Sequence, residues 1–206
     1  MEKHKTKQID TSLVDKAIIF AVKAHEGVPR RGRDFPYIVH PLEAMTIVAT
    51  MTSEPELLAA SVLHDVVEDT DFTVEDIRAE FGDRVADLVD AETEKHDQSL
   101  RSREESWHDR KAAALEALKA APRDVKIVAL GDKLSNMRAI ARDFQRYGSD
   151  FWEQFHAKDP RSHAWRFRAL VEAMADLNGL EAYGEFAYLV DFVFTKACAG
   201  CSDENK

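Results

Sequence analysis

Apolar residues recur along most of this chain at the three-to-four-residue spacing of one helix face, as in residues 125–138. Runs of strict alternation between apolar and polar residues, which are typical of strands, are missing. Gly82 and Gly179 follow periodic segments and are natural helix ends. The pattern predicts an all-α fold with helices over residues 13–26, 41–51, 55–67, 74–81, 84–94, 104–121, 123–143, 161–178 and 181–196.

Two polar segments predict where helices begin. Ser53 and Glu56 have the spacing of a capping box ahead of the apolar run 57–63, in which each side chain binds the main chain of the other. Thr73 and Asp76 have the same spacing and resemble a cap for the helix that follows them. Both helices should therefore begin directly after these residues.

The chain has 206 residues, a length that fits one domain burying about 70% of its extended-chain surface. We expect a motif-bearing core at about 13–142, C-terminal helices within 150–197, an exposed polar loop at 96–105 and a disordered tail at 200–206. No apolar run approaches the roughly 18 residues of a membrane helix, and the start is polar. We therefore expect a cytoplasmic protein without a membrane span.

The formal net charge is −10, which argues against broad binding to nucleic acid, because that binding requires clustered Lys and Arg. A small ligand is therefore the expected partner. An oligomer remains possible, since composition does not address the association of subunits.

The run from His64 to Thr70 carries the most specific chemical signal. An almost entirely apolar helix leads directly into the polar residues His64, Asp65, Glu68 and Asp69. At about 3.6 residues per turn, His64 shares a helix face with Glu68, and Asp65 shares one with Asp69. His64 and Asp65 can hold a cation, and Glu68 and Asp69 can direct the water bound to that cation. A solvated acidic helix end has the same pattern, so further ligands must decide between the two interpretations.

Two further ligands are available elsewhere in the chain. His40 precedes Pro41, which can start a helix, so its imidazole should lie at a helix end. Asp132 and Asn136 interrupt an apolar helix face one turn apart, and a buried carboxylate must be paired or bound to metal. His40 and Asp132, together with His64 and Asp65, give a set of two histidines and two aspartates. Such ligands suit Mn²⁺, Fe²⁺, Zn²⁺ or Mg²⁺, with positions left for water and substrate.

These motifs, in their order and spacing, resemble the HD-domain hydrolases of RelA/SpoT homologues, and especially the stand-alone small alarmone hydrolases. The resemblance covers roughly residues 13–142. It is carried by His40-Pro41, by the run His64 to Thr70, by residues 73–77 with Phe81-Gly82, and by residues 131–138. It implies an HD-type helical bundle that removes the 3′-pyrophosphate from guanosine tetra- and pentaphosphate.

The resemblance also implies the roles of single residues. It places a metal, usually Mn²⁺ in this family, on the four ligands named above. Glu68 and Asp69 match the acidic pair that positions and activates the attacking water. Asn136 matches a residue near the bound nucleotide, and Arg31 matches an arginine that stacks on the guanine base. A planar guanidinium can stack in this way, although a solvated loop cation is the alternative for Arg31.

A polyanionic substrate on an acidic protein requires local positive charge, so a basic pocket is expected. Arg110 and Lys111 follow Trp107 at a predicted helix start, where a tryptophan can equally anchor the core. The candidate cations for substrate binding are Arg30, Arg31, Arg33, Arg110, Lys111, Lys133 and Arg138.

Two departures from the family pattern leave the nucleobase open. Gly32 stands where the family usually carries a lysine, and Ala139 stands where it often carries a threonine. The alternatives are an HD phosphohydrolase acting on another nucleotide or on a 2′- or 3′-monophosphate, and a nucleotide sensor without activity. The length leaves no room for a nucleotide pyrophosphokinase domain after the hydrolase-like region, so synthesis is not expected.

Overall fold

A computed structural model describes residues 9–30, 32–93, 107–155 and 157–199. Within these ranges the chain forms helices and turns without a strand, which confirms the all-α prediction. The predicted loop at 96–105 and the tail at 200–206 lie outside the described residues. The α-helices are α1 (Ser12–Ala24), α2 (Val39–Val48), α3 (Pro55–Leu63), α4 (Val66–Asp69), α5 (Val74–Phe81), α6 (Asp83–Glu92), α7 (Trp107–Ala120), α8 (Arg123–Tyr147), α9 (Pro160–Ala173) and α10 (Glu181–Ala199).

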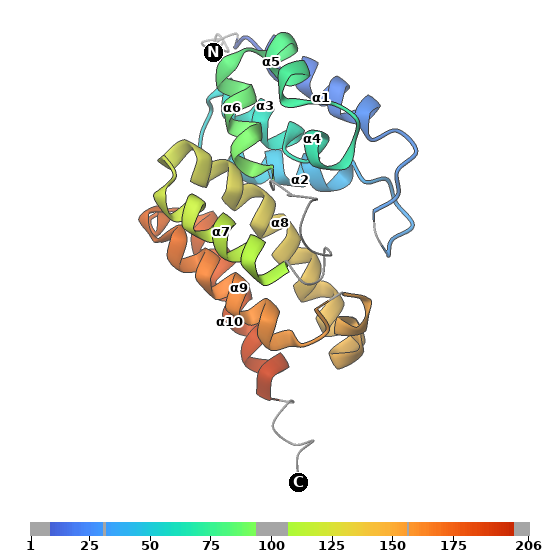
Figure 1. Cartoon of the computed structure of the whole chain (residues 1–206), viewed down its shortest axis with the longest axis vertical. Coiled ribbons are helices and arrows are strands. Elements are labelled where there is room, and N and C mark those ends of the chain that lie inside the picture. Colours follow the sequence, from blue (N-terminus) through green and yellow to red (C-terminus); the bar gives the residue numbers. More distant parts are fainter. Residues whose placement is uncertain (1–8, 31, 94–106, 156, 200–206) are drawn as a thin grey trace, which may run out of the picture.

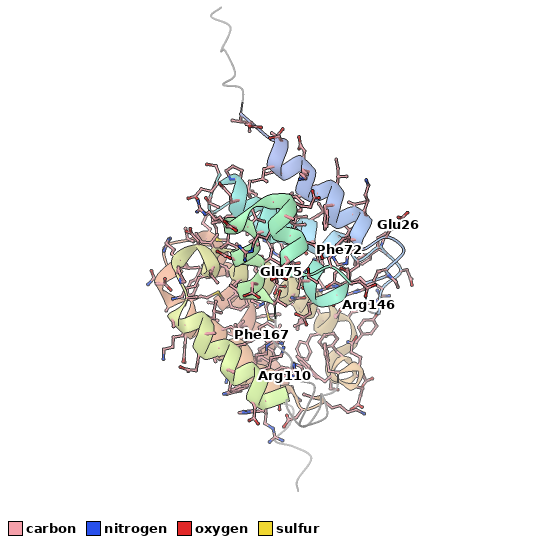
Figure 2. The ribbon with its side chains drawn as sticks, turned by 45° about the horizontal axis from the view of Figure 1, so that its top comes forward. Glu26, Phe72, Glu75, Arg110, Arg146 and Phe167 are labelled. Atoms are coloured by element: carbon pink, nitrogen blue, oxygen red, sulfur yellow. The ribbon has the colours of Figure 1, made fainter. Side chains whose placement is uncertain are left out.

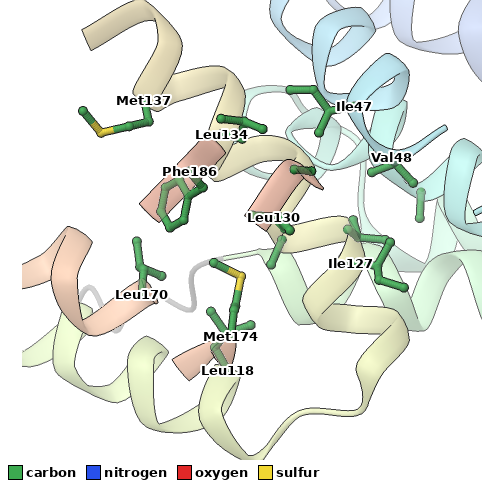
Figure 3. Close-up of a cluster of buried hydrophobic side chains, with 14 of the residues drawn as sticks. Ile47, Val48, Leu118, Ile127, Leu130, Leu134, Met137, Leu170, Met174 and Phe186 are labelled. Atoms are coloured by element: carbon green, nitrogen blue, oxygen red, sulfur yellow. The ribbon is translucent and has the colours of Figure 1, made fainter. Parts of the chain in front are cut away.

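Helix α8 is the central element of the bundle. It packs on α2, α3 and α6 on one side and on α10 on the other, while α7 packs on α9 (Figure 1). Its apolar residues, including Ile127, Leu130 and Leu134, meet Val48 of α2 and Phe186 of α10 in one buried cluster (Figure 3). Residues that are distant in sequence therefore meet along α8. Across the described ranges, every helix is too short or too polar to span a lipid bilayer.

The predicted helix 55–67 is interrupted. Helix α3 ends at Leu63, His64 and Asp65 form a turn, and α4 begins at Val66. At this turn, Asp65 accepts a hydrogen bond from Tyr37, and His64 faces Asp132 of α8, so both side chains have polar partners on other elements.

The predicted capping box at Ser53 is also wrong. Glu54 is the N-cap of α3 and makes no capping hydrogen bond through its side chain. Pro55 is the reason, because its fixed φ suits the first helical position and moves the cap one residue past Ser53.

Other helix ends follow their local chemistry. Thr73 and Asp76 form the predicted capping box, and Gly82 ends α5 with a φ of 85° that favours glycine. Helix α9 stops at Ala173, before the predicted end at residue 178, and the 3₁₀ helix η2 (Ala175–Leu177) leads to Gly179. Helix α8 runs past the predicted end to Tyr147, where the 3₁₀ helix η1 (Gly148–Gln154) begins.

Gly131 permits the close approach of α2 and α8. A Cβ atom added at this glycine would lie 2.6 Å from Val48 Cγ2 and 2.9 Å from the main-chain oxygen of Ala44. Main-chain atoms of a packed helix cannot move away cheaply, so a side chain at this position would force the two helices apart. His40 lies on α2 and Asp132 follows Gly131 on α8, so the same contact fixes their separation.

Gly131→Ala should lower the free energy of unfolding by about 1–3 kcal/mol, as expected for an overpacked core. Gly184→Ala is the matched control, because Gly184 also lies in a helix but has open space around its Cβ position. The control should gain about 0.5–1 kcal/mol from helix propensity. Urea denaturation of both variants measures the difference, and equal stabilisation of both would contradict the proposed close contact.

Candidate metal centre

Four side chains from three separate chain segments converge beside the centre of α8. His40 comes from the first turn of α2, His64 and Asp65 from the turn between α3 and α4, and Asp132 from α8. The two imidazole Nε2 atoms are 3.3 Å apart. Asp65 Oδ2 lies 3.0 Å from His64 Nε2 and 3.4 Å from His40 Nε2. Asp132 Oδ1 lies 3.1 Å from His40 Nε2 and 3.6 Å from His64 Nε2.

These separations fit a metal ion. Ligands about 2.1 Å from an ion lie about 3.0 Å apart at adjacent octahedral positions and about 3.4 Å apart in a tetrahedron. His40, His64 and Asp65 offer atoms that lie within 4.8 Å of one another, and Asp132 adds an oxygen to the same space. The geometry therefore accommodates one divalent ion bound by two nitrogens and two oxygens.

Hydrogen bonds outside the cluster set the orientation of both imidazoles. His64 Nδ1 lies 2.8 Å from the main-chain oxygen of Ser61, which only accepts, so Nδ1 donates the hydrogen. His40 Nδ1 lies 2.8 Å from Ser135 Oγ, and the Ser135 hydroxyl donates to Glu43 Oε2 at 2.9 Å. As neutral rings, both histidines then direct the Nε2 lone pair into the cluster, which is the arrangement of metal-binding histidines.

The two aspartates are held as carboxylates. Burial alone would raise the pKa of Asp132, but Lys133, His40 and His64 outweigh it and hold that pKa well below its usual value. The pKa of Asp65 is likewise held low, against burial, by His64 and His40. Four groups with lone pairs therefore face one another, and the cluster requires positive charge at its centre.

The pKa of His64 shows the same requirement. Burial alone would lower this pKa, but Asp65 and Asp132 outweigh burial and raise it well above the usual value. The carboxylates therefore favour a positive charge at the position of Nε2, which either a proton or a metal ion can supply.

Additional polar contacts support the carboxylates. The Tyr37 hydroxyl donates to Asp65 Oδ2 at 2.6 Å, and Asn136 donates to Asp132 Oδ1. Lys133 donates to Asp132 Oδ2 and lies 3.2 Å from Glu92 Oε2. Burial would lower the pKa of Lys133, but these two carboxylates outweigh it and raise that pKa, so the ammonium stays charged.

The cluster opens into a pocket of about 840 Å³, a volume typical of small-molecule sites. Helix α7 provides an apolar wall with Leu115 and Leu118, and Arg110 lies on the same helix (Figure 2). Of the predicted residues outside the metal set, those that line this pocket are Arg30, Glu68, Arg110, Lys111, Lys133 and Asn136.

The remaining predicted residues lie elsewhere. Arg33 pairs with Asp143, and neither residue lines the pocket. Asp69 is exposed and is absent from the pocket lining, which includes Glu68. Its carboxylate nevertheless lies close enough to the Tyr37 hydroxyl to help, after burial and Asp65, to raise the pKa of that group. Arg31 lies outside the described residues.

Arg138, which was a candidate for substrate binding, instead binds two carboxylates. Its guanidinium binds Glu185 of α10 through two hydrogen bonds of 2.6 Å and lies 3.4 Å from Glu43. It does not line the pocket either.

The pocket is mixed in charge rather than simply basic. Its cations are Arg30, Arg110, Lys111, Lys133 and Arg166, and its carboxylates beyond the metal set are Glu68, Asp90, Glu92 and Asp109. Arg30 Nη2 donates to Asn136 Oδ1 at 2.6 Å, and its guanidinium lies 5.1 Å from the centre of the Tyr37 ring. These two contacts fix an arginine at the pocket wall.

Three residues at the site are not indicated by the sequence motifs: Tyr37, Glu92 and Arg166. Tyr37 lies three residues before His40, and this nearness to a ligand was the available signal. Arg166 lies on α9, far along the chain from every motif, and only the packing of α7 on α9 and of α8 on α10 brings it to the pocket.

The HD domain family matches residues 17–160, which is more than half of the chain and includes all four cluster residues. The chain belongs to the HD-domain family. Its relatives include a guanosine-3′,5′-bis(diphosphate) 3′-pyrophosphohydrolase of Vibrio cholerae, 37% identical over 127 residues, which are 61% of this chain and 17% of that protein. A GTP pyrophosphokinase of Streptomyces coelicolor is 38% identical over 136 residues, covering 65% of this chain and 16% of the relative. The HD-domain chain thus spans about one sixth of the length of these curated relatives.

Two solved structures share the fold of this HD-domain protein. A protein of Listeria monocytogenes is 33% identical with a TM-score of 0.65, and the match covers 78% of this chain and 97% of that one. A metazoan ortholog of SpoT, described as hydrolysing ppGpp, has a TM-score of 0.68 at 23% identity, with 91% of this chain and 97% of that one covered. The second likeness concerns the fold alone.

Asp65→Ala and Asp132→Ala should each abolish retention of Mn²⁺, because each removes one of four ligands and half of the negative charge that attracts the ion. Metal content after dialysis, measured by plasma mass spectrometry, checks this. Glu68→Gln is the control, since Glu68 lines the pocket outside the ligand set, and it should keep the metal. Full metal content in both aspartate variants would refute the ligand assignment.

Proposed function

We propose that this HD-domain protein is a metal-dependent phosphohydrolase that removes the 3′-pyrophosphate from guanosine tetraphosphate, pentaphosphate or a closely related alarmone. The observation that carries the proposal is the cluster of two imidazoles and two carboxylates at a pocket that also presents Glu68 and several cations. The name of the Vibrio cholerae relative supports this substrate class. We further propose Mn²⁺ as the working ion, since mixed nitrogen and oxygen ligands suit it. The proposed location is the cytoplasm.

A divalent ion at this cluster would supply a water of lowered pKa and would stabilise charge on phosphoryl oxygens. His40, His64, Asp65 and Asp132 would hold that ion. Tyr37 keeps the Asp65 carboxylate in place through its 2.6 Å hydrogen bond, and Asn136 and Lys133 do the same for Asp132. These supports matter because a ligand that moves by a fraction of an ångström misplaces the attacking oxygen.

Glu68 is the proposed general base. Its side chain is exposed and lines the pocket within one helical turn of His64 and Asp65, so it can accept a proton from the attacking water. The water oxygen forms a bond to the phosphorus on the ribose 3′ oxygen. The bond between that phosphorus and the 3′ oxygen then breaks, pyrophosphate leaves, and the 3′ oxygen takes up a proton. Asp69 is proposed to assist Glu68 by acting on Tyr37, whose hydroxyl donates to Asp65.

The pocket cations are proposed to bind the phosphates. Arg30, Arg110 and Lys111 lie along the pocket wall, and Lys133 brings an ammonium to the edge of the cluster. Such groups offset the negative charge that develops as the phosphoester breaks. Arg31 remains the proposed stacking partner of the base. It matches the family's stacking arginine in sequence position, and it is next to Arg30 in the sequence.

Hydrolysis of another nucleotide is the second candidate function. It is favoured by the mixed charge of the pocket, whose lining carboxylates offset part of the attraction of its cations for a highly charged substrate. A substrate with fewer phosphates would tolerate these carboxylates better. A sensor without activity is opposed by Glu68, which gives the pocket a base beside the metal ligands.

Guanosine tetraphosphate with Mn²⁺ should give pyrophosphate release at a kcat/KM well above that for GTP, ATP and 3′-monophosphates. Glu68→Gln should lower kcat by roughly 10²- to 10⁴-fold, the range for loss of a general base. A panel of substrates and divalent ions, followed by coupled detection of pyrophosphate and phosphate, measures both values. Faster turnover of ordinary nucleotides would favour the second candidate, and tight binding without turnover under every ion would favour a sensor.

Arg31→Ala should raise KM by roughly tenfold with little change in kcat, since stacking of a cation on a base contributes about 1–2 kcal/mol of uniform binding. Arg33→Ala is the matched control from the same loop, because Arg33 pairs with Asp143 away from the pocket. Steady-state kinetics on guanosine tetraphosphate measure both variants. An unchanged KM for Arg31→Ala would favour the alternative that Arg31 is a solvated loop cation.

A further inference from the structure

The two histidine ligands are held in different ways. His64 donates through Nδ1 to a main-chain oxygen of its own helix, that of Ser61. His40 has no such main-chain partner among the described contacts and relies on the Ser135 hydroxyl of α8. The orientation of one ligand is thus built into the backbone, and that of the other depends on side chains.

A continuous line of hydrogen bonds and ion pairs leads outward from His40. Ser135 Oγ lies 2.8 Å from His40 Nδ1 and donates to Glu43 Oε2 at 2.9 Å. The other oxygen of Glu43 lies 3.4 Å from Arg138 Nη1, and Arg138 binds Glu185 through two hydrogen bonds of 2.6 Å. The line begins on α2, crosses α8 and ends on α10, beyond the segment that matches the HD domain family.

We propose that Ser135 and Glu43, supported by Arg138 and Glu185, are positioning residues that fix the His40 imidazole for metal binding. The inference rests on the metal site of the proposed function, and it assigns to these four residues a role that acts through His40 rather than on the substrate. It also gives a function to Arg138, which does not line the pocket.

The direction of each hydrogen bond follows from the acceptor at the far end. An ionised Glu43 carboxylate can only accept, so the Ser135 hydroxyl must donate to it. The serine oxygen then offers its lone pairs to His40 Nδ1, which must carry the hydrogen. The ring is therefore held with the Nε2 lone pair toward Asp65 and Asp132, where a metal ion requires it.

Burial makes this line of contacts necessary. His40 is 5% exposed and Ser135 is 2% exposed, so water cannot easily replace a lost partner. Without the hydroxyl, the Nδ1 hydrogen would lie unpaired in the protein interior, which costs about 1–3 kcal/mol and favours other ring states. Arg138 contributes by binding the second oxygen of Glu43, which leaves the first oxygen directed at Ser135.

Ser135→Ala should weaken binding of Mn²⁺ to the metal-free 206-residue chain by roughly 10- to 100-fold, the usual loss when the partner of a metal-binding histidine is removed. Glu43→Met should have a similar effect. Glu43→Gln should keep most of the affinity, because its amide oxygen can still accept from Ser135. Isothermal titration with Mn²⁺ alone measures the affinities, and thermal unfolding of each metal-free variant verifies that it folds.

Thr50→Val is the matched control, because the Thr50 hydroxyl donates to the main-chain oxygen of Ile47 at the end of the same helix α2 and touches no cluster residue. It should bind Mn²⁺ as the unchanged chain does. Arg138→Met should weaken Mn²⁺ binding by a few-fold while leaving KM unchanged at saturating metal. A raised KM with unaltered metal affinity would instead make Arg138 a substrate contact.

Nitrogen-15 NMR of the metal-free protein gives a readout that requires no metal. The His40 Nδ1–H signal should be protected from solvent exchange in the unchanged chain and should lose this protection in Ser135→Ala. Unaltered protection together with unaltered Mn²⁺ affinity in Ser135→Ala overturns the positioning role and leaves the proposed function intact. If the unchanged chain binds no divalent ion, the proposed function and the role in metal binding both fail, and loss of protection in Ser135→Ala then shows only that Ser135 orients the His40 ring.

Discussion

The site depends on the close packing of α2 on α8, which brings four lone-pair groups together around a space that favours positive charge. His40 on α2 and Asp132 on α8 can meet because Gly131 leaves no Cβ between the helices. His64 and Asp65 join them because α3 ends at Leu63, directly before these two residues. Charges of like sign would otherwise repel in this space, so the packing energy of the bundle is what holds the cluster together.

The cluster is supported by an outer layer of polar contacts that differs at each ligand. A main-chain oxygen holds His64, a tyrosine hydroxyl holds Asp65, and Asn136 with Lys133 holds Asp132. These groups fix tautomers, orientations and charge states before an ion arrives, which reduces the reorganisation that binding requires. His40 alone depends on a line of side chains that extends to the last helix, so the C-terminal helices influence the metal centre as well as the stability of the bundle.

The pocket combines this centre with a wall of mixed charge. Arg30 and Lys133 are close to the cluster and already engaged with Asn136, Asp132 and Glu92. A phosphate must therefore compete with, or join, existing hydrogen bonds, and this favours a ligand whose charges match the fixed positions of the cations. The acidic members of the wall disfavour further negative charge beside them, so under the proposed function they would contribute to selection among nucleotides.

The pattern of residues along the chain was enough to predict the helical class, most helix positions and the four residues that meet in the cluster. Helical periodicity is local, and a carboxylate or histidine on an apolar face is visible without coordinates. Three outcomes needed the packed helices: the helix breaks at His64, Glu68 lines the pocket, and Arg33 and Arg138 bind carboxylates away from it. The contacts of the two arginines depend on Asp143 and Glu185, which no local pattern links to the motifs. The direction of a long charged side chain is set by the opposite charge that the packed helices bring within its reach.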